Sequence, residues 1–350
     1  MKLTIADVAR EARVSRATVS RVINGVPNVN GETVALIRQT MEKMGYVRPA
    51  IRPGPKPRLQ HPSRLRTGAI ALVTIGGSGD LFREPTMASV IDQIQTICRK
   101  HQLSLLLDQM SSPEHLPLCV QARRVDGVLL MVAGRPPKMR ECIRKLADML
   151  PVVHFFAPGH PVAGVDHVSV NDVALGALAY HTLKDAGCKS FVLVTRWEEF
   201  LEALLVRGRA FMDRAAVDGA PVEVFASPMA GVKPAQLWPA GVARIATSGE
   251  ISDLAIDGMP GPVGVFVTHE GSARAVHQAL EKRELLSTGA ARLIVAGSTA
   301  HYVSGLEPAP QLLSLDVPGI ISLAIDRLIH RAIHLPSGAL TFLTSPKLVA

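Results

Sequence analysis

The stretch TIADVAREARVSRATVSRVING, residues 4–25, decides how this chain begins. Thr4 followed by Asp7 is a helix-capping pattern, and apolar side chains then recur every three or four residues, as on one face of a helix. Ser15 is placed to cap a second short helix whose inward face includes Val19. Two short helices with so tight a connection predict a helix-turn-helix.

A third helix is predicted directly after this stretch. Gly25 and Pro27 end the second helix, and Asn30 can cap the next one. Apolar residues continue at spacings of three and four until Gly45, a residue suited to the left-handed end of a helix. Three helices around one small core form an all-α unit, which we place at residues 1–47.

The second helix of a helix-turn-helix enters the DNA major groove, with its N-terminal residues facing base edges. We therefore predict that Arg16, Ala17 and Arg21 read bases, and Arg16 is suited to a bidentate contact with guanine. Polar groups nearby are predicted to contact the DNA backbone. These are Thr4, Ser15, Thr18, Ser20, Asn24, Asn28, Thr33 and Tyr46. The alternative is a basic helix that faces only solvent.

The distribution of charge supports DNA binding. Residues 1–66 contain 13 Lys and Arg against 4 Asp and Glu, whereas the rest of the chain contains 25 against 26. A basic segment attached to a neutral body is typical of a polyanion-binding module joined to a domain with another role.

Composition restricts the remaining classes. With 350 residues, 47% of them apolar and 19% charged, the chain predicts a globular protein with a large core. The first residues have no secretory pattern and no run reaches roughly 18 apolar residues, so we expect a cytoplasmic protein without a membrane span. The four widely spaced cysteines indicate reduced core thiols rather than a zinc site or disulfides.

Residues 4–25, together with Val29, Glu32, Thr33 and the Gly45–Tyr46 pair, closely resemble the DNA-binding domain of the LacI/GalR family of bacterial repressors. The resemblance extends in pattern over the whole chain. It implies a helix-turn-helix followed by a periplasmic-binding-protein-like type I sensor domain. It also implies a dimeric repressor that binds a palindromic operator on double-stranded DNA, with a small-molecule effector, no cofactor and no enzymatic activity.

The linker at residues 48–66 departs from this family. Family members usually continue into a short hinge helix, but the alternating prolines of residues 49–57 are incompatible with an α-helix. An extended basic strand is expected instead, in which Arg52, Lys56 and Arg58 form a minor-groove arm. The segment is loosely similar to an AT-hook but lacks the Arg-Gly-Arg-Pro core. A plain spacer is the alternative, and Ile51 or Leu59 can still supply an apolar wedge.

From residue 67 onward, short apolar runs alternate with helical stretches, which predicts an α/β fold of two doubly wound parallel sheets. Strands are expected near residues 69–75, 103–107, 128–132 and 152–156 in one sheet, and near 191–195, 222–226, 263–268 and 293–296 in the other. We place subdomain N at about 67–170 and 301–332, and subdomain C at about 171–300 and 333–350. In open α/β sheets, ligands bind beyond the carboxyl ends of the strands, so the effector is expected in a cleft between the subdomains.

The resemblance also implies effector contacts. Arg207 with Phe211 matches the family's Arg-x-x-Gly-Phe motif with Ala210 in place of glycine, and that arginine normally binds ligand oxygens; the alternative is a surface arginine. The other predicted positions are Ser78, Phe156, His269, Glu270 and Thr299. The family's Asn-Asp and Gly-Phe-Asp patterns have become His269–Glu270 and Gly297-Ser298-Thr299, so an ordinary hexose is a poor match. A His-Glu pair is also common as a purely structural pair.

Other functions have little support in the sequence. Residues 76–80 are glycine-rich after a strand, but they match no phosphate-binding motif and are better explained as a cleft loop. No hydrolase or metalloprotease motif is present, and the spacing of the twelve histidines predicts no metal site. The second class considered is an architectural DNA-binding protein whose α/β domain only dimerises.

Overall fold

The structure is a computed structural model that describes residues 4–23, 29–46, 65–76, 85–133, 138–156, 162–195, 202–226, 244–246, 256, 258–298, 300–334 and 338–349. The chain divides into two compact units, Met1–Gln60 and His61–Ala350, and each is described by itself. Several predicted site residues lie outside the described residues. These are Asn24, Asn28, Arg52, Lys56, Arg58, Ser78 and Thr299.

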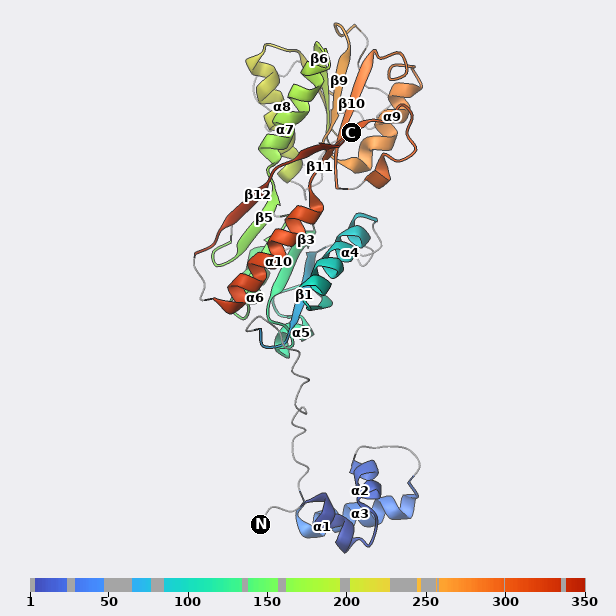
Figure 1. Cartoon of the computed structure of the whole chain (residues 1–350), viewed down its shortest axis with the longest axis vertical. Helices are drawn as coiled ribbons and strands as arrows, with labels where there is room; N and C mark the ends of the chain where they lie inside the picture. The colour runs from blue at the N-terminus through green and yellow to red at the C-terminus, as the bar shows by residue number, and fades with distance from the viewer. Residues whose placement is uncertain are drawn as a thin grey trace. The chain divides into compact units, whose positions relative to one another are not determined.

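The N-terminal unit has the three predicted helices, α1 (Ile5–Glu11), α2 (Arg16–Ile23) and α3 (Gly31–Met44) (Figure 1). The predicted caps are confirmed. The Asp7 carboxylate accepts hydrogen bonds from the backbone N–H and the hydroxyl of Thr4, at 2.9 and 2.7 Å. The Ser15 hydroxyl oxygen accepts from the Thr18 N–H at 3.0 Å, and Asn30 accepts from the Glu32 N–H at 3.1 Å. These contacts satisfy N–H groups that the helix itself leaves unpaired.

A small apolar core holds the three helices together. Val8, Val19 and Ile37, one from each helix, are fully buried, and Ala9 and Ala12 pack beside them. So small a core contributes modest stability, so each helix cap matters more in this unit than in a larger domain.

The second unit contains two mainly parallel sheets. Sheet A has the order β12-β5-β4-β3-β1-β2 and sheet B the order β13-β11-β10-β9-β6-β7-β8. The strands of sheet A are β1 (Ala69–Gly76), β2 (Ser104–Met110), β3 (Val128–Ala133), β4 (Val152–Phe155), β5 (Asp166–Val170) and β12 (Thr341–Thr344). Those of sheet B are β6 (Ser190–Thr195), β7 (Val222–Ala226), β8 (Arg244–Ala246), β9 (Val263–Val267), β10 (Ala291–Gly297), β11 (Gln311–Ser314) and β13 (Lys347–Val349). Only β13, among the described strands, pairs antiparallel.

Helices cover both faces of each sheet, as Figure 1 shows. Those of sheet A are α4 (Pro85–Lys100) and α10 (Val317–Ile333) on one face, and α5 (Leu118–Gln121) and α6 (Met139–Ala147) on the other. Sheet B has α7 (Asp172–Asp185) and α8 (Glu202–Val217) on one face and α9 (Ala273–Glu281) on the other. The strands are therefore buried on both faces, which explains their continuous apolar runs.

Helices α7 and α8 approach closely because of one glycine. A Cβ built on Gly176 of α7 would lie 2.1 Å from the backbone oxygen of Arg207 on α8. The four cysteines are free and buried, and burial raises the pKa of Cys98 and Cys188 to about 11. These thiols are therefore inert core residues, as predicted.

The chain crosses between the sheets at three places, and two of them differ from the predicted boundaries. The first crossover follows β5 at Asn171, close to its predicted position. The second comes after β11, which pairs with β10 in sheet B, so residues 311–314 do not belong to subdomain N as predicted. The third comes after β12, which pairs with β5, so residues 341–344 do not belong to subdomain C. Both strands are short and flanked by polar residues, so the sequence contains no clear apolar run that would predict them. No helix within the described ranges is long and apolar enough to cross a bilayer.

Candidate functional site

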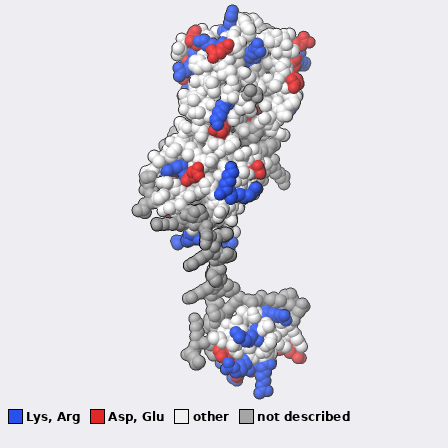
Figure 2. Space-filling view, viewed as in Figure 1, with Lys and Arg blue, Asp and Glu red and all other residues white. Residues whose placement is uncertain are grey.

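The first candidate surface is the exposed side of α2. Arg16, Ala17 and Arg21 are all exposed there, whereas Val19 points into the core. Figure 2 shows Lys and Arg side chains over much of the N-terminal helical unit, with fewer Asp and Glu. The predicted base-reading residues thus share one accessible helix side, which is the geometry that groove binding requires.

The described residues among the predicted backbone contacts fall into three groups. Thr4, Ser15 and Thr18 use their hydroxyl groups in helix caps, and the Ser15 and Thr18 oxygens lie 2.8 Å apart. Ser20 and Thr33 are half-buried. Tyr46 differs from the prediction: only 8% of it is exposed, and its ring belongs to the core with Val8 and Ile37. An aromatic residue after a helix can either face the DNA or pack into the core of the unit, and the sequence alone does not distinguish these two positions.

The second candidate site lies at the carboxyl ends of sheet B. The direction in which successive strands are added to this sheet reverses between β6 and β9. From β6 the sheet continues to β7 and β8 on one side, and β9, β10 and β11 follow on the other side. Thr195 is the last residue of β6 and Thr268 directly follows β9. The Thr268 hydroxyl donates to the Thr195 hydroxyl at 2.9 Å, and both residues are buried. Ligands of open α/β sheets bind beyond such a point.

Arg207 reaches this edge from α8, as the resemblance implied, but its groups are already paired. Its Nε donates to the Asp172 carboxylate at 2.6 Å, and its Nη1 donates to the Thr268 carbonyl at 3.0 Å. Arg207 is only 6% exposed. Burial raises the pKa of Asp172, against the opposing effect of the Arg207 charge. This "Arg207 cluster", comprising Arg207, Asp172 and Thr268, is therefore a buried, neutralised ion pair beside the predicted ligand edge.

The other described effector positions are also held from within the chain. Glu270 is 4% exposed and accepts hydrogen bonds from the backbone N–H and the hydroxyl of Ser298, beyond β10. His269 accepts from the Gly271 N–H through its Nδ1 at 3.0 Å. Phe156, directly after β4, is half-buried and has a left-handed backbone conformation with φ +52°. The structure thus brings Arg207, His269 and Glu270 to one edge of sheet B, while Phe156 follows a strand of sheet A.

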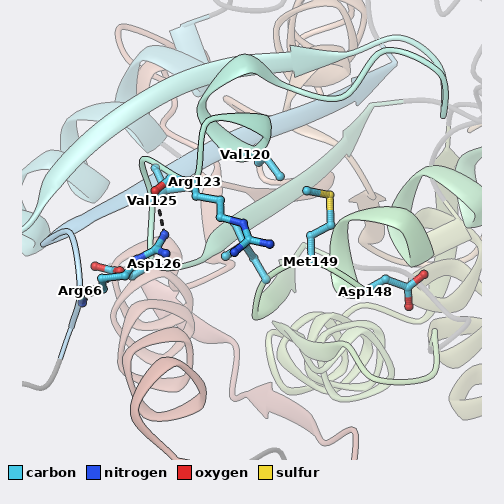
Figure 3. Close-up of a pocket in the computed structure, with 8 residues that line it drawn as sticks. Arg66, Val120, Arg123, Val125, Asp126, Asp148 and Met149 are labelled. Carbon is cyan, nitrogen blue, oxygen red and sulfur yellow. Dashed lines mark hydrogen bonds between the residues drawn. The ribbon is translucent and has the colours of Figure 1, made fainter. Parts of the chain in front are cut away.

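A cavity of about 370 Å³ lies at the amino ends of β1, β3 and β4 in sheet A (Figure 3). No sequence motif identified the residues that line it. Arg66, Arg123, Asp126, Asp148 and Met149 line it with Val120, Val125 and Leu150. The Asp126 carboxylate accepts from the backbone N–H groups of residues 66, 67 and 68, at 2.7 to 3.1 Å. Asp126 therefore fixes the point at which the second unit begins its first strand.

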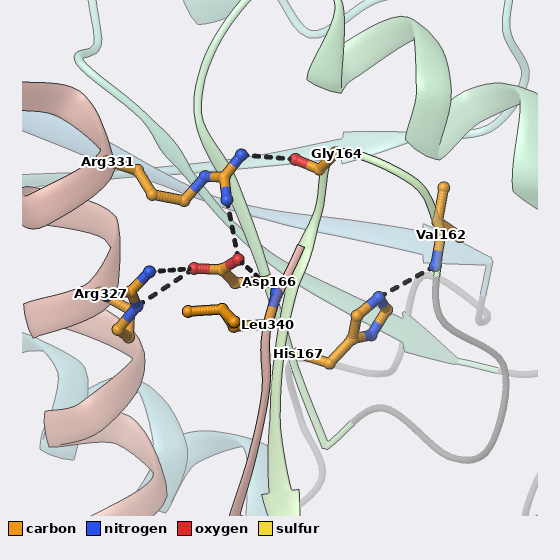
Figure 4. Close-up of polar contacts among 7 residues, drawn as sticks. All are labelled: Val162, Gly164, Asp166, His167, Arg327, Arg331 and Leu340. Carbon is orange, nitrogen blue, oxygen red and sulfur yellow. Dashed lines mark hydrogen bonds and ion pairs between the residues drawn. The ribbon is translucent and has the colours of Figure 1, made fainter. Parts of the chain in front are cut away.

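A second buried arginine–aspartate group was also missed by the sequence analysis (Figure 4). Asp166, fully buried at the start of β5, accepts from Arg327 at 2.8 and 3.1 Å, from Arg331 at 2.7 Å and from the Leu340 N–H at 3.0 Å. Both arginines come from α10. We name these four residues the "Asp166 cluster"; it joins β5, α10 and the segment that enters β12.

Comparison with known proteins agrees with this arrangement. The family model described as bacterial regulatory proteins, lacI family, matches residues 4–49. Catabolite control protein A of Priestia megaterium is 30% identical over 196 residues, which are 56% of this chain and 55% of that protein. The chain thus matches little more than half the length of this curated relative.

Solved structures match over a larger share. The lac repressor dimer bound to operator and the anti-inducer ONPF covers 100% of this chain and 98% of its own, with a TM-score of 0.59 and 15% identity. A periplasmic binding protein/LacI transcriptional regulator from Alkaliphilus metalliredigens QYMF, complexed with D-xylulofuranose, covers 81% and 97%, with a TM-score of 0.56 and 17% identity. At these identities the likeness establishes the fold, a helical unit followed by two periplasmic-binding-protein-like subdomains, as predicted.

Proposed function

We propose that this chain, whose residues 4–49 match the model of the lacI family of bacterial regulatory proteins, binds double-stranded DNA as a transcription regulator. The observation that carries the proposal is α2, which exposes Arg16 and Arg21 beside a buried Val19. Guanidinium groups on an exposed recognition helix suit both phosphates and the N7 and O6 atoms of guanine. The concentration of basic residues before position 67 adds the nonspecific attraction to DNA.

The finer proposal is a repressor that binds a palindromic operator as a homodimer. A helix-turn-helix of this size contacts one half-site, so specific binding requires two copies arranged by a two-fold axis. The solved lac repressor structure that this chain resembles is a dimer bound to operator, which supports the assembly.

We propose that a small molecule beyond the carboxyl ends of sheet B modulates DNA affinity. Because Asp172 already neutralises Arg207, a second carboxylate there would meet no free positive charge from this arginine. A neutral, hydroxyl-bearing effector fits this edge better than an organic acid. The D-xylulofuranose complex of a structural neighbour agrees with that chemistry.

The first experiment selects bound duplexes from a random pool with the full-length chain and with the Arg16→Ala variant, at stated salt concentration. A palindromic motif whose guanine preference relaxes in the variant is expected. Recovery of binding without any motif would contradict operator recognition.

The alternative is an architectural DNA-binding protein whose α/β unit only dimerises. The pairing of Arg207 with Asp172 and of Glu270 with Ser298 favours this alternative, since both side chains form hydrogen bonds within the chain without a ligand. The two functions can be distinguished by measuring the melting temperature of the chain in the presence of neutral sugars, polyols and organic acids. A selective rise in melting temperature that also changes operator affinity supports the regulator, because a switch must bind ligand differently in its two states.

A further inference from the structure

Two histidines lie side by side at the end of α10. His330 and His334 are one helical turn apart, both are exposed, and their ring centroids are 4.5 Å apart with an interplanar angle of 41°. His334 caps the helix, and its backbone N–H donates to the His330 carbonyl at 2.9 Å. Neither imidazole forms a hydrogen bond or ion pair with another described side chain.

The spacing of this pair differs from the expectation that the histidines of the chain have no metal-ligand spacing. The sequence HRAIH, residues 330–334, places two imidazoles at positions i and i+4. On a helix these positions share one face, so both rings can present a nitrogen to the same ion. Neutral imidazole is a preferred ligand of Zn²⁺, Ni²⁺ and Cu²⁺.

The surroundings favour a cation at this point. Helix C-terminal carbonyl groups carry partial negative charge. His330 lies in the last turn of α10, and His334 is the C-cap residue that follows it. Asp326 lies one turn earlier on the same face and interacts with His101 at 3.4 Å. The nearby positive groups, Arg327 and Arg331, are directed to Asp166 instead.

We propose that His330 and His334 form a two-histidine site for a divalent transition metal, with water in the remaining coordination positions. No group of three or more metal-binding side chains occurs within the described ranges, so the ion is held weakly and exchanges. Its binding cross-links the last turn of α10, the helix that supplies both arginines of the Asp166 cluster. Metal binding therefore stabilises the α/β unit, because only the folded helix brings the two rings together.

The test uses the full-length chain without a polyhistidine tag, titrated by calorimetry with Zn²⁺ alone and with Ni²⁺ alone. We expect one ion per chain at this site and a rise in the melting temperature of the α/β unit. His330→Ala and His334→Ala should each weaken binding by about tenfold or more and remove the rise. Both side chains are exposed, so neither variant should unfold the protein.

The matched control is His101→Ala, which removes a neighbouring histidine but leaves the i, i+4 pair intact and should keep binding. Absence of binding in the parent chain would overturn the proposal, and so would binding in His330→Ala and His334→Ala as tight as in the parent chain.

Discussion

The Arg207 cluster and the Asp166 cluster are both buried arginine–aspartate groups, yet they occupy opposite kinds of position. Asp172 and Arg207 meet beside the carboxyl ends of β6 and β9, where open sheets bind ligands. Asp166 lies at the first residue of β5, at the amino end of its strand. Two arginines and a backbone N–H share its carboxylate, against one arginine for Asp172.

A buried guanidinium group therefore does not by itself identify a ligand site. At Asp166 every carboxylate contact joins β5 to α10 or to the segment that enters β12, and its burial leaves no access for a ligand. At Arg207 the same kind of pair lies beside the carboxyl ends of β6 and β9, where ligands of open α/β sheets bind. Location within the sheet, more than residue type, separates a structural cluster from a candidate effector site.

The largest expected effect is that of Asp166→Ala on stability. The substitution leaves two buried guanidinium groups and the Leu340 N–H without their shared acceptor, so we expect a loss of about 3–5 kcal/mol in the free energy of unfolding. Urea unfolding of the α/β unit measures it. The control Asp213→Ala removes an exposed carboxylate from α8 and should change little. A loss as small as that of the control would show that the cluster is not a structural clamp.

Arg207→Met should destabilise the protein by about 3 kcal/mol, because it leaves Asp172 buried without its partner. Asp172→Asn in the same chain should recover part of this loss, and a double-mutant cycle by urea unfolding isolates the coupling. If the cluster also serves the effector, Arg207→Met should abolish the effector-induced rise in melting temperature. The control Arg209→Met makes the same change at an exposed position of α8 and should retain the rise.

Much of the fold was predictable because capping and periodicity are local signals. Thr4, Ser15 and Asn30 cap helices as their side-chain chemistry predicts, and long apolar runs became β1, β3 and β9. The strands β5, β11 and β12 were missed, since their sequences mix polar residues with short apolar stretches. Their places depend on long-range pairing, and the subdomain boundaries were therefore wrong at the second and third crossovers.

The candidate site was predictable in place but not in detail. Arg207 and Glu270 do lie near the carboxyl edge of sheet B, but their partners Asp172 and Ser298 are 35 and 28 residues away in sequence. Spacing alone cannot reveal such pairs. The Asp166 cluster joins residues more than 160 positions apart and left no local pattern at all.

A third prediction concerns acid stability near the Asp166 cluster. His154 and His167 face each other on β4 and β5, with ring centroids 5.4 Å apart, and burial lowers the pKa of His154 to about 3. Both ring nitrogens of His154 lack a partner among the described residues. The folded protein therefore keeps this ring neutral while the unfolded chain protonates it below about pH 6.5, so stability is complete above that pH and falls as the pH decreases toward 3.

Between pH 6.5 and 5 this histidine should account for a loss of about 2 kcal/mol in the free energy of unfolding. Urea unfolding across this range measures the slope. His154→Leu should reduce the slope, whereas His181→Leu, at an exposed position of α7, should leave it unchanged. An equal slope in the parent chain and His154→Leu would contradict the assignment.

The smallest effect is expected in the N-terminal unit, where no buried ion pair contributes to the described core. Gly45 ends α3 with φ +67°, and a Cβ there meets no atom within 4 Å, so Gly45→Ala introduces only backbone strain. We expect a loss of about 1 kcal/mol in the stability of this unit, measured by thermal unfolding followed by helical circular dichroism. Gly31→Ala is the matched control, because Gly31 also has open space but a φ that alanine adopts freely, and it should be neutral or stabilising. Equal effects of the two substitutions would show that the left-handed end of α3 does not limit stability, and that this unit, like the larger one, depends mainly on its buried contacts.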